Sequence, residues 1–241
     1  MKKFILMVQF LTRIPINVYL KVDEKDFSDG IKYFPLVGLI IGMFIVSFYY
    51  IGYNIGGGFL ASIMAVVIEV FITGGLHLDG LGDTFDGIYS NRSKDKMLEI
   101  MKDSRLGTNA ALAIFLTILL KIALIYSLHI PNVYPVLLLM PVFSRLCIVY
   151  GARFSVYART SGMGNMFIGK TNNKHVIIAM LISSLLSFLN FWSFPFIFIG
   201  LLFSIFYIRH ISSKIGGMTG DTLGALCELS ELVYLFYVVI I

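Results

Sequence analysis

The feature that constrains this chain most is a series of apolar stretches close to the length that crosses a bilayer. A spanning helix needs about 20 predominantly apolar residues. Only 14% of the residues are charged, whereas an ordinary soluble domain carries about 25%. No polar stretch is long enough to fold as a separate soluble domain of ~50 residues or more. The candidate spans cover residues 33–53, 59–76, 109–128, 133–150, 175–192, 194–208 and 223–241.

This pattern predicts an all-α fold, a polytopic integral membrane bundle of about seven transmembrane helices plus interfacial helices. The sixth span is short, so the pattern supports six or seven spans. Residues 1–241 are predicted to form a single membrane-embedded domain.

The first residues of the chain imitate a signal peptide. Lys2 and Lys3 precede an apolar run over residues 4–10, but Arg13 and Pro15 interrupt the run before a full apolar segment develops. We therefore expect this segment to be retained as an interfacial helix.

Basic residues are confined to alternate connectors. Lys and Arg precede the first span and lie between spans two and three, four and five, and six and seven, whereas the connectors 54–58, 129–132 and 192–193 contain none. Short cytoplasmic loops collect Lys and Arg. We therefore expect a multi-pass protein of the cytoplasmic (plasma) membrane, which is the cell inner membrane where there are two, with its N-terminus and charged loops facing the cytoplasm.

An acidic segment follows the second span. Asp79, Asp83 and Asp86 are spaced i, i+4, i+7, which on a helix puts all three carboxylates on one face. Three like charges at this spacing repel one another unless a cation lies among them. Oxygen-only ligands suit Mg²⁺ or Mn²⁺ better than zinc. The spacing therefore predicts a metal site formed by Asp79, Asp83 and Asp86.

The same segment is rich in glycine, which argues against a regular helix throughout. Each glycine costs about 1 kcal/mol relative to alanine in a helix interior, but it also permits close backbone approach. The alternative is a flexible, solvated acidic loop. His77, in the same segment, is either a hydrogen-bonding group or a further ligand. The glycines are Gly74, Gly75, Gly80, Gly82 and Gly87.

Cations follow the acidic segment at 92–107. Met97, Ile100 and Met101 mark one side of a short helix expected to lie on the membrane, followed by Lys102 and Arg105. Cations this near a metal site suit a phosphate ester bridged by the metal, with the planar guanidinium of Arg105 on its oxygens. The alternative is a helix held by lipid headgroups through its Lys and Arg.

Two further charged loops have a similar character. Arg153 and Arg159 flank a glycine-bearing turn that either receives a second anion or only enforces orientation. Gly-Asp-Thr occurs at 82–84 and again at 220–222, each time after a Gly-Gly pair. This indicates an internal pseudo-repeat, with Asp83 and Asp221 in corresponding places and facing a common cleft.

Few ionisable residues lie well inside the predicted spans, whereas transporters more often place them near the bilayer midplane. Lys121 and Arg145 are expected to snorkel or to pair, with a direct role in substrate binding as the alternative. Glu69 either braces a cation site or pairs with one of these two bases, and the sequence does not choose between them.

Several motifs together resemble cobalamin synthase, the adenosylcobinamide-GDP ribazoletransferase family. They are Gly-Gly-Leu-His-Leu-Asp-Gly-Leu-Gly-Asp-Thr-Phe-Asp-Gly at 74–87, Ile-Met-Lys-Asp-Ser-Arg-Leu-Gly at 100–107 and Gly-Met-Thr-Gly-Asp-Thr-Leu-Gly-Ala at 217–225. Phe-Leu-Thr-Arg-Ile-Pro at 10–15 and Tyr-Phe-Pro-Leu-Val-Gly at 33–38 match the same family. The chain departs from it at 159–164, which reads Arg-Thr-Ser-Gly-Met-Gly where the family commonly has Arg-Pro-Gly-Gly-Leu-Gly.

The resemblance implies a membrane enzyme of the last steps of cobalamin (vitamin B12) biosynthesis. Such a transferase moves the adenosylcobinamide-phosphate group from adenosylcobinamide-GDP to α-ribazole or its 5′-phosphate. It releases GMP, forms adenosylcobalamin or its 5′-phosphate, and depends on Mg²⁺. The implied partners are these substrates and the lipid bilayer, with a second copy of the chain or other cobalamin-assembly enzymes as candidates and no nucleic acid.

For this reaction we expect Asp79, Asp83 and Asp86 to hold Mg²⁺ on the diphosphate and Arg105 to steady the leaving GMP. Asp83 or Asp221 is expected to accept the hydroxyl proton. The expected active site faces the cytoplasm. Expected substrate-binding residues are His77, Lys102, Ser104, Arg105, Arg153, Arg159 and Thr219.

Two rival functions remain at this point. A CDP-alcohol-type phosphotransferase also places aspartates and glycines at a membrane edge, but its usual Ala-Arg pair after the first Asp-Gly is not reproduced here. A divalent-cation transporter would use the aspartates as an entry site and would release no GMP.

Overall fold

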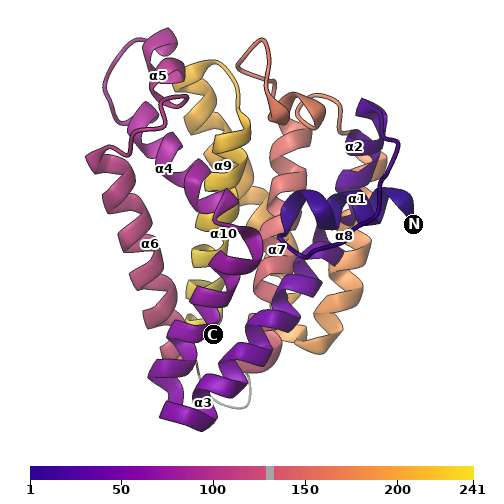
Figure 1. The fold of residues 1–241 in the computed structure, drawn as a ribbon, viewed down its shortest axis with the longest axis vertical. Helices are drawn as coiled ribbons and strands as arrows, with labels where there is room; N and C mark the ends of the chain where they lie inside the picture. Colours follow the sequence, from indigo (N-terminus) through magenta and orange to yellow (C-terminus); the bar gives the residue numbers. More distant parts are fainter. Residues whose placement is uncertain (129–132) are drawn as a thin grey trace.

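The computed structural model describes residues 1–128 and 133–241, and within these ranges it contains helices and no β-strand (Figure 1). The prediction of an all-α fold is therefore confirmed. An isolated bridge joins Tyr157 to Met218. The helices are α1 (Lys2–Leu11), α2 (Glu24–Gly30), α3 (Phe34–Thr73), α4 (Leu76–Ile88), α5 (Lys94–Ile100), α6 (Thr108–Ser127), α7 (Val133–Phe154), α8 (Asn173–Leu186), α9 (Phe196–Ile215) and α10 (Gly220–Ile240).

Helix α3 contains both of the first two predicted spans. Its backbone leaves helical geometry at Gly56 and Gly57, where Gly57 has φ 74°, a value that residues with a side chain rarely adopt. Figure 1 shows α3 running to the bottom of the view and turning back there. The two arms touch at the turn, where a Cβ on Gly52 would lie 2.8 Å from the Cα of Ala61. One helix therefore supplies two antiparallel apolar arms.

Five helical segments in the described ranges are long and apolar enough to cross a membrane, and the first of them includes all of α3. The predicted fifth span, 175–192, is instead the 14-residue α8 followed by two 3₁₀ turns, Ser187–Leu189 and Phe191–Ser193. The predicted sixth span was too short, because α9 continues to Ile215 and exposes Arg209 and Lys214. The count of seven is thus not confirmed, and the connector 129–132 lies outside the described residues.

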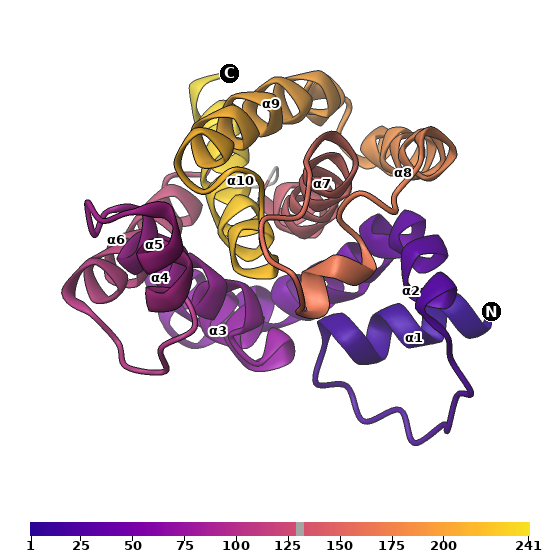
Figure 2. The same cartoon turned by 90° about the horizontal axis from the view of Figure 1, so that it is seen from above.

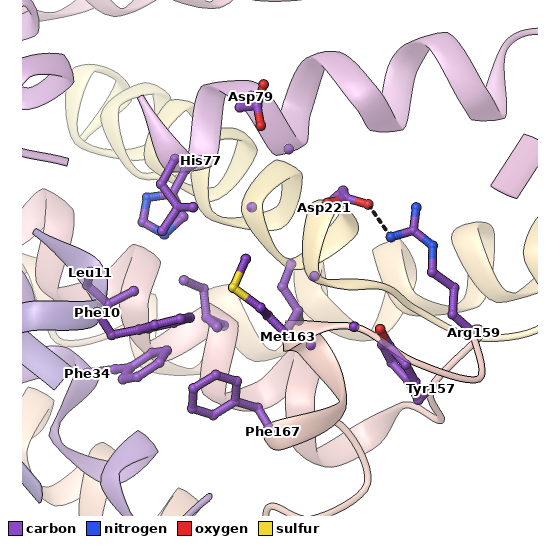
Figure 3. Close-up of a pocket in the computed structure, with 18 residues that line it drawn as sticks. Phe10, Leu11, Phe34, His77, Asp79, Tyr157, Arg159, Met163, Phe167 and Asp221 are labelled. Atoms are coloured by element: carbon purple, nitrogen blue, oxygen red, sulfur yellow. Dashed lines mark ion pairs between the residues drawn. The ribbon is translucent and has the colours of Figure 1, made fainter. Parts of the chain in front are cut away.

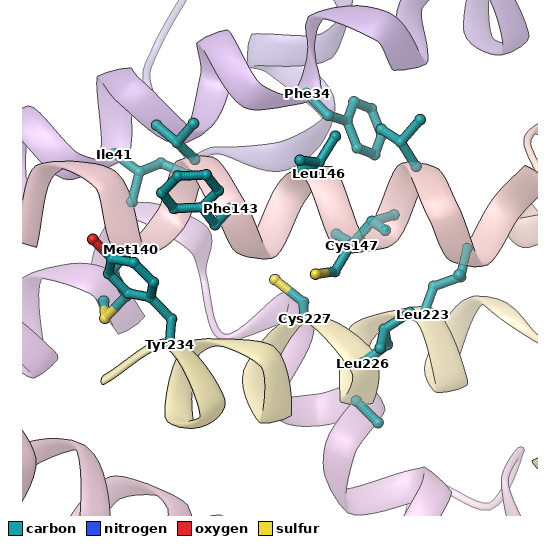
Figure 4. Packing of buried hydrophobic residues seen from close by; sticks show 14 of the residues in the cluster. Phe34, Ile41, Met140, Phe143, Leu146, Cys147, Leu223, Leu226, Cys227 and Tyr234 are labelled. Carbon is teal, nitrogen blue, oxygen red and sulfur yellow. The ribbon is translucent and has the colours of Figure 1, made fainter. Parts of the chain in front are cut away.

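Helix α7 forms the centre of the bundle. It contacts α3, α8, α9 and α10, which surround it in the view of Figure 2, and nearly all of its side chains are buried. Phe143 of α7 lies 5.2 Å from Tyr234 of α10 and 5.5 Å from Phe196 of α9, measured between ring centroids. Figure 4 shows Cys147 and Cys227 between α7 and α10, where both are buried free thiols. This tight packing holds α10 against the rest of the bundle.

Helix α5, which the sequence predicted to lie on the membrane, has its apolar side turned toward the protein. It packs against α4, and its apolar side is covered there, with Met97 and Met101 buried. The reason is Gly87 of α4, which has no side chain and leaves room for the Met101 side chain. The Lys102 to Arg105 segment is therefore held next to α4.

Candidate active site

Helix α4 begins at a sharp change of direction after α3. Gly74 and Gly75 have φ of 64° and 70°, in the left-handed region that glycine adopts without strain and that commonly ends helices. Their amide groups donate to the carbonyl oxygens of Phe71 and Val70 at 3.2 and 3.0 Å. The chain then starts the new helix at Leu76, which carries Asp79 and Asp83 toward the end of the bundle where α5 lies (Figure 1).

The expectation that glycines would interrupt the acidic segment was wrong, because α4 is a continuous helix over Leu76–Ile88. Its glycines serve as contact points. A Cβ on Gly80 would lie 2.7 Å from the carbonyl oxygen of Asp221, and one on Gly224 of α10 would lie 3.3 Å from the Cα of His77. Small residues at a helix crossing let two backbones approach closely. The crossing brings the aspartates of α4 next to Asp221.

Arg159 and Asp221 form an ion pair beside this crossing. The guanidinium Nη1 lies 2.8 Å from Asp221 Oδ2, and the pair is drawn in Figure 3. The loop that carries Arg159 is bound to the α9–α10 connection, since Ala158 N donates to Met218 O and Met218 N donates to Val156 O. Thr219 precedes α10 and caps it, since its hydroxyl accepts from Thr222 N, and the hydroxyl donates to Asp221 Oδ2 at 3.3 Å. Thr219 thus orients Asp221.

Two cavities are lined by residues of α4, and Arg159 lines both of them. One, of about 390 Å³, is lined mainly by apolar side chains, among them Phe10, Phe34 and Phe167, and we name it the apolar pocket (Figure 3). The other, of about 420 Å³, is named the charged pocket. Asp79 and Arg159 line both. The charged pocket also contains Asp83, Asp86, Lys102, Asp103, Ser104 and Arg105.

Asp83 has the most perturbed acidity in the charged pocket. Burial, followed by repulsion from Asp221 and Asp79, raises the pKa of its carboxyl from 3.8 to about 7. Asp83 and Asp221 are close enough to repel each other, but they line different pockets. Nor do they occupy corresponding places, since Asp83 is in the middle of α4 and Asp221 is in the first turn of α10. Repulsion of this kind is relieved when a cation binds between the carboxylates.

Asp86 differs from the other two predicted ligands because it already has hydrogen-bond donors. Its carboxylate accepts from Gly107 N at 2.7 Å and Ala110 N at 2.9 Å, at the start of α6, where an anion is favoured by the unpaired amide groups. Each oxygen retains a further lone pair. Asp86 therefore joins α4 to α6 and still faces the charged pocket.

The donor set fits a hard divalent cation, although not as a finished cage. Within residues 1–128 and 133–241, no three His, Cys, Asp or Glu side chains are arranged so as to hold a metal ion. Mg²⁺ is commonly bound by one or two carboxylates, waters and the oxygens of a substrate phosphate rather than by a protein cage. Asp79 and Asp83 offer such carboxylates in the charged pocket. The three-aspartate metal site stays a prediction.

The remaining predicted site residues divide into two groups. Lys102, Ser104 and Arg105 line the charged pocket. The Arg105 side chain is 88% exposed and pairs with Asp103 at 2.5 Å, which lowers the pKa of the Asp103 carboxyl to about 2.

The second group lies outside that pocket. His77 lines the apolar pocket, and its Nδ1 lies 3.4 Å from Arg145, so it is placed as a hydrogen-bonding group. Thr219 is fully buried and lines neither pocket. Arg153 also lines neither, since its Nε donates to Asn173 Oδ1 at 2.7 Å and its guanidinium lies over the ring of Phe154.

A buried network of charges was only partly foreseen. Glu69 pairs with Lys121 at 3.1 Å and lies 3.9 Å from Arg145, so the sequence alternative of pairing is the one that the structure bears out. Lys121 also contacts Glu228 at 2.8 Å and Glu231, and Arg145 contacts Glu231 at 2.5 Å. The sequence contained one signal for this network. Charged side chains inside apolar helices need partners of opposite charge. Glu228 and Glu231 on α10 are the acids that pair with Lys121 and Arg145.

The fold and the two pockets define a polytopic α-helical membrane protein with a carboxylate-rich site beside a basic loop, an arrangement suited to a phosphorylated ligand. A family model described as Cobalamin-5-phosphate synthase matches residues 3–239, and the chain belongs to this family.

Curated relatives agree with the family match. Proteins named adenosylcobinamide-GDP ribazoletransferase are similar to this chain over nearly their whole length. The relative from Alkaliphilus metalliredigens is 46% identical over 100% of this chain and 96% of its own length. The relative from Clostridioides difficile is 45% identical over 99% of this chain and 97% of its own length. The relative from Fusobacterium nucleatum is 43% identical over 100% of this chain and 98% of its own length. No solved structure matches the chain.

Proposed function

We propose that this protein is an adenosylcobinamide-GDP ribazoletransferase. The observation that carries the proposal is full-length similarity to curated proteins of that name, joined to a pocket that contains both carboxylates and basic side chains. The CDP-alcohol-type phosphotransferase and the divalent-cation transporter gain no support from the comparisons.

In the proposed reaction a ribose hydroxyl of α-ribazole, or of its 5′-phosphate, attacks the phosphorus nearer the cobinamide. A new P–O bond forms to that oxygen, and the bond between this phosphorus and the oxygen shared with GMP breaks. GMP leaves as the anion, and the hydroxyl proton passes to a carboxylate. Reactions of this type depend on positioning and on charge neutralisation.

The side chains of the charged pocket suit these tasks. Lys102 and Arg105 lie where they can bind phosphate oxygens of the donor and offset the charge that GMP carries away. Arg105 is exposed, and among the residues that the structure describes its ion-pair partner is Asp103, two positions away, so it can exchange Asp103 for a phosphate. Arg159, at the boundary of both pockets, pairs with Asp221 and orients its carboxylate.

Asp83 and Asp221 are the proposed proton acceptors. Asp221 lines the apolar pocket and Asp83 lines the charged pocket. Burial, followed by repulsion from Asp221, raises the pKa of the Asp83 carboxyl. A carboxyl titrating near neutral pH matches a general base better than an ordinary one.

Asp79, Asp83 and Asp86 are the residues that would hold Mg²⁺, which when bound neutralises diphosphate charge. We further propose that the site faces the cytoplasm from the plasma membrane, which the distribution of basic loops supports. Association with a second copy of the chain or with other cobalamin-assembly enzymes stays a prediction.

The proposal is tested by release of GMP from adenosylcobinamide-GDP by the purified, detergent-solubilised protein. We expect GMP and a cobalamin product in equal amounts when α-ribazole and Mg²⁺ are present, and neither when Mg²⁺ is chelated. Omission of the acceptor controls for simple hydrolysis. Liposomes loaded with a Mg²⁺ indicator test the transporter alternative, and ion flux without GMP release would overturn the assignment.

A further inference from the structure

The apolar pocket has aromatic rings from three separate parts of the chain. Phe10 comes from α1, Phe34 begins α3, and Phe167 lies in the loop after α7. The Phe167 ring centroid lies 5.3 Å from that of Phe10 and 5.5 Å from that of Phe34. Phe34 and Phe167 are almost fully buried, whereas Phe10 is only half-buried. The rings thus form one aromatic floor, in which Phe10 is the least buried ring.

Met163 adds a second accessible side to this cavity. Its side chain is drawn in Figure 3 between the aromatic rings and the aspartates, and the residue is 64% exposed. Thioethers make favourable contacts with aromatic rings and adapt to the shape of a ligand. A ring and a thioether at the edge of one apolar cavity are suited to a planar aromatic group.

The size of the cavity limits which ligand can carry the planar aromatic group. A dry cavity of roughly 150 Å³ holds one benzene molecule, so about 390 Å³ accommodates a fused bicyclic base together with a ribose. A corrin macrocycle with its side chains and axial adenosyl group is much larger than such a nucleoside and exceeds this volume.

The opposite end of the cavity is polar. Asp79, Asp221 and Arg159 line it, and Asp79 and Arg159 continue into the charged pocket. A ligand with an aromatic base at one end and ribose hydroxyls at the other would match this gradient. Its hydroxyls would then lie at the boundary between the pockets, next to the space proposed for the donor diphosphate.

We infer that the apolar pocket binds the acceptor nucleoside, and that Phe10 and Met163, supported by Phe34 and Phe167, recognise its heteroaromatic base. The inference rests on the proposed function, which supplies α-ribazole, a benzimidazole nucleoside, as the acceptor. The donor diphosphate and its guanosine lie on the other side of Asp79, in and beside the charged pocket.

The test compares Phe10→Ala and Met163→Ala with a matched control, Phe4→Ala. Phe4 lies on the same helix as Phe10 but contacts Tyr33 and does not line the pocket. Loss of one apolar contact to the base is expected to raise KM for α-ribazole by roughly tenfold to a hundredfold. KM for adenosylcobinamide-GDP and the kcat at saturating acceptor should stay near wild-type values. The control should change neither KM.

Free benzimidazole base provides a second measurement. It should inhibit wild-type GMP release competitively with α-ribazole and not with the donor, and this inhibition should weaken in both pocket variants. If the variants raise KM for the donor instead, the pocket holds part of the donor and the inference is wrong. If neither KM changes and the base does not compete, the cavity belongs to another occupant, such as a lipid acyl chain, and the inference is again wrong.

A binding measurement that does not require turnover separates failure of this inference from failure of the proposed function. Should the wild-type protein release no GMP, equilibrium dialysis of α-ribazole against the purified protein still tests the pocket. Binding by wild type and Phe4→Ala but not by Phe10→Ala or Met163→Ala would support it, and equal binding by all four would overturn it. Met163 is exposed, so its variant tests recognition without disturbing the fold.

Discussion

The molecule contains two groups of carboxylates that have opposite surroundings. Glu69, Glu228 and Glu231 lie inside the bundle, almost completely buried, and contact Lys121, with Arg145 on the far side of Glu231. The four aspartates at the end of the bundle line two cavities, and within the described ranges only Asp221 among them has an ion-pair partner, Arg159. These aspartates are Asp79, Asp83, Asp86 and Asp221.

The difference concerns what compensates each set of charges. Buried carboxylates in a membrane protein need partners supplied by the protein itself, because water is excluded. The inner group has two such cations and joins α3, α6, α7 and α10. The outer group lacks enough cations of its own and opens to cavities that a ligand can enter. We therefore regard the inner group as structural and the outer group as the reactive one.

The largest expected effect comes from breaking the inner group with Lys121→Met. Removing one partner of a buried charge network typically costs 3–5 kcal/mol, roughly, because the remaining charges stay uncompensated. We expect the protein in detergent to unfold at a clearly lower temperature. Lys96→Met is the control, because its exposed pair with Glu99 contributes about 0–1 kcal/mol. If the unfolding temperature is unchanged and turnover is lost, Lys121 takes part in the reaction. The distinction between a structural inner group and a reactive outer group would then be wrong.

The next largest effect is expected from Asp83→Asn in the outer group. Loss of one group that stabilises charge in the transition state costs roughly 2.7–4 kcal/mol of barrier, or a hundredfold to a thousandfold in turnover. Stability should not fall, since the substitution removes repulsion with Asp221 and Asp79. GMP release and thermal unfolding are measured on the same samples, with Asp95→Asn on the exposed side of α5 as the control. Near-normal turnover would refute the role of Asp83.

The sequence predicted the class of fold and the acidic helix face because both depend on local patterns. Apolar stretches near 20 residues predict spans, and the i, i+4, i+7 spacing placed Asp79, Asp83 and Asp86 along one helix. Prediction from the sequence failed where contacts between distant segments override local preference. The cost of glycine in α4 is offset by the close contact between Gly80 and the start of α10, and no local pattern reveals that contact.

Long-range packing also explains the parts of the site that the sequence missed. The aromatic floor of the apolar pocket comes from residues 10, 34 and 167, which only the fold brings together. Arg153 and Arg159 looked equivalent in the sequence, yet only Arg159 reaches the pockets, because the bridge between Tyr157 and Met218 holds its loop against α10. Arg153 is drawn toward Asn173 at the start of α8.

A smaller effect is expected from Arg159→Lys. The arginine guanidinium is planar and contacts both Asp221 and, at 3.5 Å, the carbonyl oxygen of Met101. Lysine keeps the positive charge beside Asp221 but cannot make both contacts. We expect turnover to fall by about tenfold, which corresponds to loss of one charged hydrogen bond. Arg153→Lys is the matched control and should be close to wild type. A loss of equal size in Arg153→Lys would restore Arg153 to the substrate-binding set.

The final expected effect is a pH dependence of stability that originates at Asp83. Burial and neighbouring carboxylates raise the pKa of Asp83 from 3.8 to about 7 in the folded protein. The folded state therefore holds this proton more tightly than the unfolded state, and the stability that the proton contributes is lost as pH rises through about 7. Without Mg²⁺, wild type should lose thermal stability relative to Asp83→Asn between about pH 5 and pH 8. Added Mg²⁺ should reverse this loss in wild type and have little effect in the variant. The same slope in both proteins, with or without Mg²⁺, would mean that Asp83 carries no uncompensated charge and would contradict the contrast between the two groups.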